Sequence, residues 1–241
     1  MTTTEVPSGI GARVPTAVLA LFVPDVGMER AARTGRVRWA LLFALVCSLA
    51  LATAQALRID ARASTLKQLD TQRRLQAMSD RQIDDAQRSA ERVFMVKRFA
   101  AGLAMPPASL LAAALALFGL SWFLRGRSQA GQIFIVGAFG LLPSALGQLI
   151  EAGAVFLRPS IAPDSGPLAA RTLADFAAAA GLSFPGVAAR LAGALDIYGL
   201  WTAVLLGCGL AAAASLPLRR ALAGTLVGWL CVRLLAVSTG G

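Results

Sequence analysis

Apolar residues gather in long blocks along this chain, and polar or proline-containing stretches separate the blocks. A helix needs about 20 mainly apolar residues to cross roughly 30 Å of hydrocarbon. Five blocks approach or reach that length, at residues 39–57, 99–124, 133–157, 191–216 and 221–237. The pattern therefore predicts an all-α polytopic membrane protein with five transmembrane helices.

The last two blocks lie closest together, because only residues 217–220 separate them. A link this short cannot return the chain across the bilayer, and the two helices must therefore run antiparallel as a membrane hairpin. Pro217 ends the first helix, and Arg219 and Arg220 place the turn at a charged membrane face.

The longest polar stretch, residues 58–98, follows the first block and contains no proline or glycine. Its composition favours helix, and Ser79 to Gln82 have the S-x-x-Q form of a capping box. We expect a helical extramembrane segment whose second helix starts near Asp80 and runs unbroken into the second span. The apolar stripe along it is weak, which indicates a solvated helical hairpin or, alternatively, a helix that binds a partner.

Residues 1–36 form an N-terminal segment ahead of the membrane domain, which covers residues 37–241. The apolar run 15–24 is too short to span, and no convincing cleavage site follows it. We expect this run to lie at the membrane surface rather than to serve as a signal peptide. A second interfacial stretch is expected at residues 169–180, where the pattern is that of an amphipathic helix.

Composition agrees with a membrane protein, since 56% of the 241 residues are hydrophobic, 15% are charged and the mean hydropathy is +0.65. The net charge of +10 would suggest nucleic acid in a soluble protein. Here the arginines mostly flank apolar blocks, where they orient helices and meet anionic headgroups. We expect the lipid bilayer as a partner, with other membrane proteins or a second copy, and no nucleic acid.

The arginines also predict the orientation of the helices. Short cytoplasmic loops carry an excess of Lys and Arg. In a five-span protein the N-terminal arginines share one side with the basic turns at residues 125–127 and 219–220. We therefore predict a cytoplasmic N-terminus and an outward C-terminus.

Catalytic and metal-binding signatures are missing from the sequence. There is no histidine, which excludes histidine-based zinc sites and Ser-His-Asp triads. Cys47, Cys208 and Cys231 lie in apolar blocks without CxxC spacing, which indicates buried packing residues. We predict no enzymatic activity and no cofactor.

Three ionisable residues lie within the predicted spans, where charge is costly: Glu151, Asp196 and Arg233. With a rise of 1.5 Å per residue, all three fall roughly 6–9 Å below the outer surface. This shared depth predicts an ion pair between Arg233 and one of the carboxylates. The alternative is a polar pocket or conduction path lined by the three residues.

Prolines and small residues mark expected helix contacts. Pro106 and Pro107 in the second span, and Pro143 in the third, free backbone carbonyls that neighbouring helices or a water-filled cleft must satisfy. Small residues at four-residue spacing permit close helix contact within the fold or between subunits. They occur at Gly224 and Gly228 and at Gly207, Ala211 and Ser215.

Short motifs occur in order over residues 21–237. They are Phe22-Val23-Pro24 before a basic run, Met78-Ser79-Asp80-Arg81-Gln82, Ala138-Phe139 ahead of Pro143, and Asp196-Ile197-Tyr198 ahead of Trp201. In this order the chain resembles the prokaryotic branch of the Ypt/Rab-interacting-protein (YIP) family of five-span membrane proteins. Asp80 stands where bacterial members have proline.

The resemblance implies five helices in a bacterial inner membrane, with a cytoplasmic N-terminus and a periplasmic C-terminus, and it carries no catalytic residues. Eukaryotic members bind Rab GTPases, a role not expected here because the sequence has no sizeable N-terminal cytosolic domain. We expect a non-enzymatic accessory or scaffold protein that acts through helix–helix contacts in export or membrane organisation. The alternative is a transport or channel component with a polar pocket formed by the outer charges.

Overall fold

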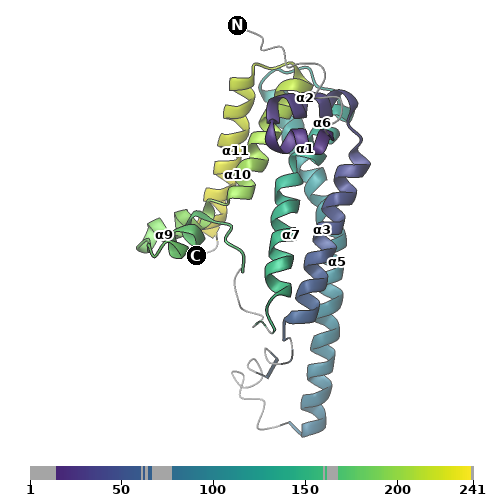
Figure 1. Cartoon of the computed structure of the whole chain (residues 1–241), viewed down its shortest axis with the longest axis vertical. Coiled ribbons are helices and arrows are strands. Elements are labelled where there is room, and N and C mark those ends of the chain that lie inside the picture. Colours follow the sequence, from purple (N-terminus) through teal and green to yellow (C-terminus); the bar gives the residue numbers. More distant parts are fainter. Residues whose placement is uncertain are drawn as a thin grey trace.

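The structure, a computed structural model, describes residues 15–60, 62, 65–66, 78–159, 161 and 168–239 (Figure 1). Apart from two isolated β-bridges, the regular structure of these residues is helical, which confirms the all-α prediction for this part of the chain. The helices are α1 (Thr16–Phe22), α2 (Pro24–Thr34), α3 (Val37–Arg58), α5 (Asp80–Phe123), α6 (Ala130–Gly140), α7 (Leu142–Phe156), α8 (Leu173–Ala179), α9 (Gly186–Ala194), α10 (Ile197–Ala214) and α11 (Leu218–Thr239).

Within the described residues, four helical stretches are long and apolar enough to cross a membrane. They are Val37–Arg58, Asp80–Phe123, Ala130–Phe156 and Ile197–Ala214. Helix α11 has 22 residues and packs along α10, as a membrane hairpin requires. The prediction of a membrane protein is therefore supported, while the fifth span remains a prediction.

Two of the predicted spans are divided in the structure. The third consists of α6 and α7, which meet at Leu141, because Pro143 in the first turn of α7 lacks the N–H that would continue the helix. The fourth begins later than expected, since α9 ends at Ala194 and α10 begins at Ile197 with Asp196 as its N-cap.

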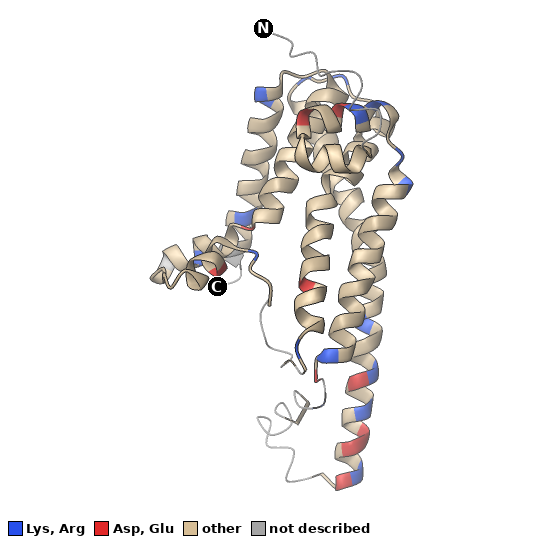
Figure 2. Ribbon diagram, viewed as in Figure 1, with Lys and Arg blue, Asp and Glu red and all other residues tan. Residues whose placement is uncertain are grey.

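Helix α5 is the longest element, with 44 residues, and confirms the predicted unbroken run. Its N-terminus is capped as the S-x-x-Q motif predicts, because the Ser79 N–H donates to Gln82 Oε1 at 3.0 Å. Pro106 and Pro107 lie inside it without ending it. Charged residues cover its far end, which projects beyond the other helices (Figure 2).

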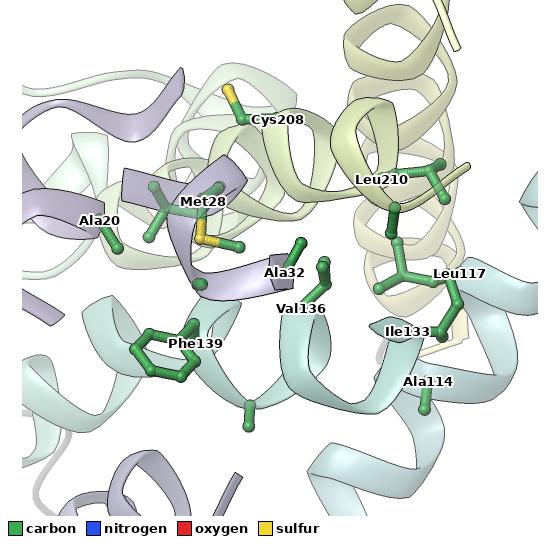
Figure 3. Packing of buried hydrophobic residues seen from close by; sticks show 14 of the residues in the cluster. Ala20, Met28, Ala32, Ala114, Leu117, Ile133, Val136, Phe139, Cys208 and Leu210 are labelled. Carbon is green, nitrogen blue, oxygen red and sulfur yellow. The ribbon is translucent and has the colours of Figure 1, made fainter. Parts of the chain in front are cut away.

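The long helices form two groups that separate from a common end (Figure 1). In one group α3 packs on α5 and α7, and in the other α10 packs on α11. The groups meet through α2 and α6, since α10 packs on both of them. The main hydrophobic core lies at this end, where Met28, Val136 and Leu210 are fully buried (Figure 3).

The N-terminal helices contribute to this core, which the sequence did not predict. We expected residues 15–24 to lie at the membrane surface, which stays a prediction. Within this run, Ala20 of α1 is fully buried and packs in one cluster with Met28 of α2. The two helices touch backbone to backbone at Gly27, where any Cβ would overlap Ala20. A second glycine, Gly209 of α10, leaves the space that Met28 and Val136 fill.

Candidate functional site

Two of the three charged residues predicted within the spans, Asp196 and Arg233, meet at the end of the hairpin that lies away from its turn. Asp196 caps the N-terminus of α10, where its Oδ1 accepts a hydrogen bond from the Tyr198 N–H at 3.0 Å. Its other oxygen, Oδ2, accepts one from Arg233 Nη2 of α11, also at 3.0 Å. The antiparallel course of α10 and α11 brings these two residues together from 37 positions apart.

A second arginine, Arg171, joins this ion pair, and sequence reasoning did not single it out. Its Nη2 lies 3.8 Å from Asp196 Oδ2, and its guanidinium carbon lies 6.0 Å from the centre of the Tyr198 ring. Backbone pairing holds it in place: the Leu173 N–H donates to Leu195 O and the Ile197 N–H donates to Arg171 O, both at 3.0 Å. The helices α8 and α9 separate these two segments in sequence, so no periodic pattern could reveal the contact.

Gly199 provides the space in which this charge cluster packs. A Cβ there would lie 2.8 Å from Arg233 Nη2, 3.0 Å from Trp229 Nε1 and 3.3 Å from Asp196 Oδ2. The Arg233 guanidinium carbon lies 5.9 Å from the centre of the Trp229 ring, within cation–π distance. Trp229 Nε1 is buried and has no hydrogen-bond acceptor among the described residues.

Glu151 lies apart from this cluster, although the predicted depths had grouped the three residues. It is 5% exposed on α7. Its Oε1 accepts the Leu168 N–H at 2.7 Å and its Oε2 accepts the Ala169 N–H at 2.8 Å. Within the described part of the chain it has no basic side chain at ion-pair distance. Glu151 therefore binds the chain that leads to α8, not Arg233.

The segment α8–α9 begins with a capping box of its own. Thr172 Oγ1 accepts the Asp175 N–H at 3.2 Å, and Asp175 Oδ2 accepts the N–H groups of Arg171 and Thr172 at 2.9 and 2.8 Å. Burial opposes ionisation of Asp175, but these hydrogen bonds and the Arg171 charge prevail and lower its pKa below 3.8. Leu173 and Phe176 of α8 are exposed, as an amphipathic helix requires.

The small residues predicted for helix contact have two different surroundings. Gly207 faces α11 within the fold, because a Cβ there would lie 2.6 Å from Thr225 Oγ1 and 2.8 Å from Leu222 Cδ2. Gly228 has no neighbour within 4 Å of such an atom. It borders an apolar groove of about 350 Å³ between α5, α10 and α11, whose walls include Ala113 and Ala116.

The arginine-bearing turns lie side by side at the common end of the helices (Figure 2). The Arg127 N–H, after α5, donates to Ala214 O at the end of α10 at 3.0 Å. Arg219 and Arg220 follow in the first turn of α11, and α2 packs against α10. The positive turns therefore share one end of the molecule.

The cysteines are scattered in the described structure. Cys47 and Cys208 are buried, as expected, but Cys231 is exposed on α11. Its helix has no partner on that face within the described chain, so an apolar block did not imply burial. No group of three or more potential metal ligands was found among the described residues.

Comparison with known proteins gives a family match over most of the chain. The Yip1 domain family matches residues 18–239. No curated protein and no solved structure gives a significant match to the chain.

Proposed function

The chain belongs to the Yip1 domain family, and we propose that it is a non-enzymatic accessory or scaffold protein of a bacterial inner membrane. In this proposal it crosses the membrane five times and acts through helix–helix contacts in export or membrane organisation. The observation that carries the proposal is the state of its intramembrane charges, which bind one another and the backbone.

A conduction path requires polar groups that remain available to water or substrate. Asp196 uses one oxygen for the N-cap of α10 and the other for Arg233. Glu151 uses both oxygens for backbone N–H groups. These contacts favour a structural role for the charges over the alternative of a transport pocket.

The prolines also favour a scaffold. Pro106 and Pro107 leave α5 continuous, so the second span has no unwound segment of the kind that forms substrate sites in transporters. Pro143 only separates α6 from α7 at Leu141. The break lies among buried residues, since Leu142 and Phe139 belong to the main core.

The proposed five-span topology rests on α11 and on the arginines. The 22 residues of α11 give a length of about 33 Å at a helical rise of 1.5 Å per residue, which is enough to cross the hydrocarbon layer. The shared end of the arginine-bearing turns supports a cytoplasmic N-terminus. A cysteine introduced at Gln82 should react with an impermeant maleimide added outside, and one at Ser128 only after permeabilisation. Labelling of Ser128 from outside would contradict the orientation.

The scaffold role can be tested at the groove beside Gly228. A photoreactive benzoylphenylalanine at Gly228 should form a discrete protein adduct in native membranes, because the groove presents small residues to a neighbouring helix. The matched control is the same residue at Val227, which is 60% exposed on α11 but does not border the groove.

Purified protein in liposomes should also give no ion flux above that of empty liposomes, measured with potential- and pH-sensitive dyes. Flux that disappears in Asp196→Asn would contradict the scaffold proposal and support a transport component. Equal adduct formation at Gly228 and Val227 would contradict the groove as the contact surface.

A further inference from the structure

A cavity of about 550 Å³ lies between α1 and the beginning of α3, at the common end of the long helices (Figure 2). This size is within the range of about 300–1,000 Å³ that is usual for small-molecule sites. It is distinct from the charge cluster and from the groove beside Gly228. Its walls come from α1, from the α2–α3 junction, and from Phe139 and Leu142.

Most of the cavity wall is apolar. Phe139 and Leu142 are buried and form its inner side, while Val18 and Phe43 are partly exposed towards its outer side. Trp39 also lines it and is 63% exposed. Tryptophan is enriched where membrane and water meet. The cavity therefore opens where the first long apolar helix enters the proposed hydrocarbon layer.

The remaining wall is polar and positive. Arg36, the N-cap of α3, lines the cavity together with Thr34. Arg38 is not among the lining residues, but its guanidinium carbon lies 5.5 Å from the centre of the ring of Trp39, which does line the cavity. Neither arginine has a carboxylate within ion-pair distance among the described residues, and the nearby Glu29 pairs with Arg33 at 2.7 Å.

The N-terminus of α3 adds to this positive character. No side chain caps it, and its first turn contains no acidic residue. The unpaired N–H groups at a helix N-terminus favour an anion, and phosphate is the usual one. Arg36 and a helix N-terminus thus lie at one rim of a mostly apolar cavity, and Arg38 follows two residues later in the same helix.

We propose that this cavity binds one anionic phospholipid of the cytoplasmic leaflet. Its phosphate would contact Arg36 and Arg38, and one acyl chain would lie against Val18, Phe43 and Phe139. A soluble anion would leave the apolar wall without a partner. A zwitterionic lipid carries no net charge to offset the two arginines, so the site selects for negative headgroups.

Trp39 supplies a built-in probe, because bromine on an acyl chain quenches tryptophan fluorescence at short range. The protein is placed in phosphatidylcholine nanodiscs containing increasing fractions of acyl-brominated phosphatidylglycerol. The signal measured is the quenching that is lost in Trp39→Phe. It should saturate at a fraction about tenfold lower than with brominated phosphatidylcholine, because anionic lipid is attracted by both arginines.

The double variant R36Q/R38Q should need about tenfold more brominated phosphatidylglycerol for half-maximal quenching. The matched control R125Q/R127Q removes the same charge at the α5–α6 turn and should leave the titration unchanged. Ala17→Phe, which fills the cavity from α1, should reduce the maximal quenching. Helicity and thermal unfolding of each variant are measured by circular dichroism, and only variants with unchanged values are compared.

Three results would overturn the proposal. Equal quenching by both lipids would show ordinary annular lipid, and competition by inorganic phosphate would show a free-anion site. Quenching that appears only after residues 1–14 are removed would show that the protein's own N-terminal residues fill the cavity.

Discussion

Two carboxylates in apolar surroundings, Glu151 and Asp196, meet different partners. Glu151 is held within the α3–α7 group and accepts two backbone N–H groups. Asp196 lies at the end of the α10–α11 hairpin and accepts one hydrogen bond from a backbone N–H and one from an arginine. The first stabilises the path of a loop, and the second fixes one helix against another. Similar predicted depth in the membrane therefore did not mean a shared site.

The largest effect is expected at Glu151. Glu151→Ala leaves the Leu168 and Ala169 N–H groups without their acceptor, and each unsatisfied buried group costs about 1–3 kcal/mol. We expect a loss of about 3 kcal/mol in the free energy of unfolding, and a smaller loss for Glu151→Gln, which keeps one acceptor oxygen. Thermal unfolding in detergent measures both. Ile150→Ala, at an exposed neighbour on α7, is the control; an equal loss there would contradict the assigned role.

Arg233→Leu should have the next largest effect, because it removes the nearer of the two arginines that pair with Asp196 and leaves only Arg171, at 3.8 Å. Breaking a fully buried pair from one side costs about 3–5 kcal/mol. We expect about 2 kcal/mol, since the Arg233 side chain is 35% exposed and partly solvated. Adding Asp196→Asn should restore part of the thermal stability.

Adding Glu151→Gln to Arg233→Leu should restore nothing, which separates the two carboxylates directly. Rescue by Glu151→Gln would show that they share a site after all. Full stability of Arg233→Leu alone would show that water already solvates the cluster, and would favour the transport alternative.

Gly199→Ala tests how tightly the Asp196 cluster packs. Its Cβ would approach Arg233 Nη2 at 2.8 Å and Trp229 Nε1 at 3.0 Å, so both side chains must shift. Overpacking of this kind costs about 1 kcal/mol or more. The control Gly228→Ala has open space and should gain about 0.5–1 kcal/mol from helix propensity. Equal melting temperatures for the two variants would contradict close packing at Gly199.

Asp175 should give the smallest effect, which in the unsubstituted protein appears only in acid. Because its pKa is lowered from 3.8 in the folded state, its stabilisation of α8 is complete well above that value and is lost as the pH falls below it. A spin label at Leu182 should therefore become more mobile below pH 3.8. In Asp175→Asn the label should be more mobile at neutral pH and its mobility less dependent on pH, because the variant loses the negative charge at the N-terminus of α8, which is worth about 0.3–1 kcal/mol. If label mobility had the same pH profile in Asp175→Asn as in the unsubstituted protein, Asp175 would be excluded as the titrating group.

Patterns that repeat along one helix were predictable from sequence, while contacts between distant segments were not. The apolar blocks and the Ser79 cap predicted α3 and the unbroken course of α5. The Arg171 contact depends on a backbone bridge that closes the α8–α9 segment, and Glu151 binds backbone N–H groups that no residue type reveals. The burial of α1 likewise depends on Gly27, whose role appears only when two helices meet.

The uninterrupted course of α5 has a mechanical consequence. Residues 80–98 extend about 28 Å beyond the apolar part of the helix at a rise of 1.5 Å per residue. Because α5 continues through Pro106 and Pro107, this extension and the intramembrane part form one continuous helix. A tilt of about 10° within the bilayer then moves the far tip by about 5 Å. A change in packing that tilts α5 inside the membrane would therefore also displace its charged end in water.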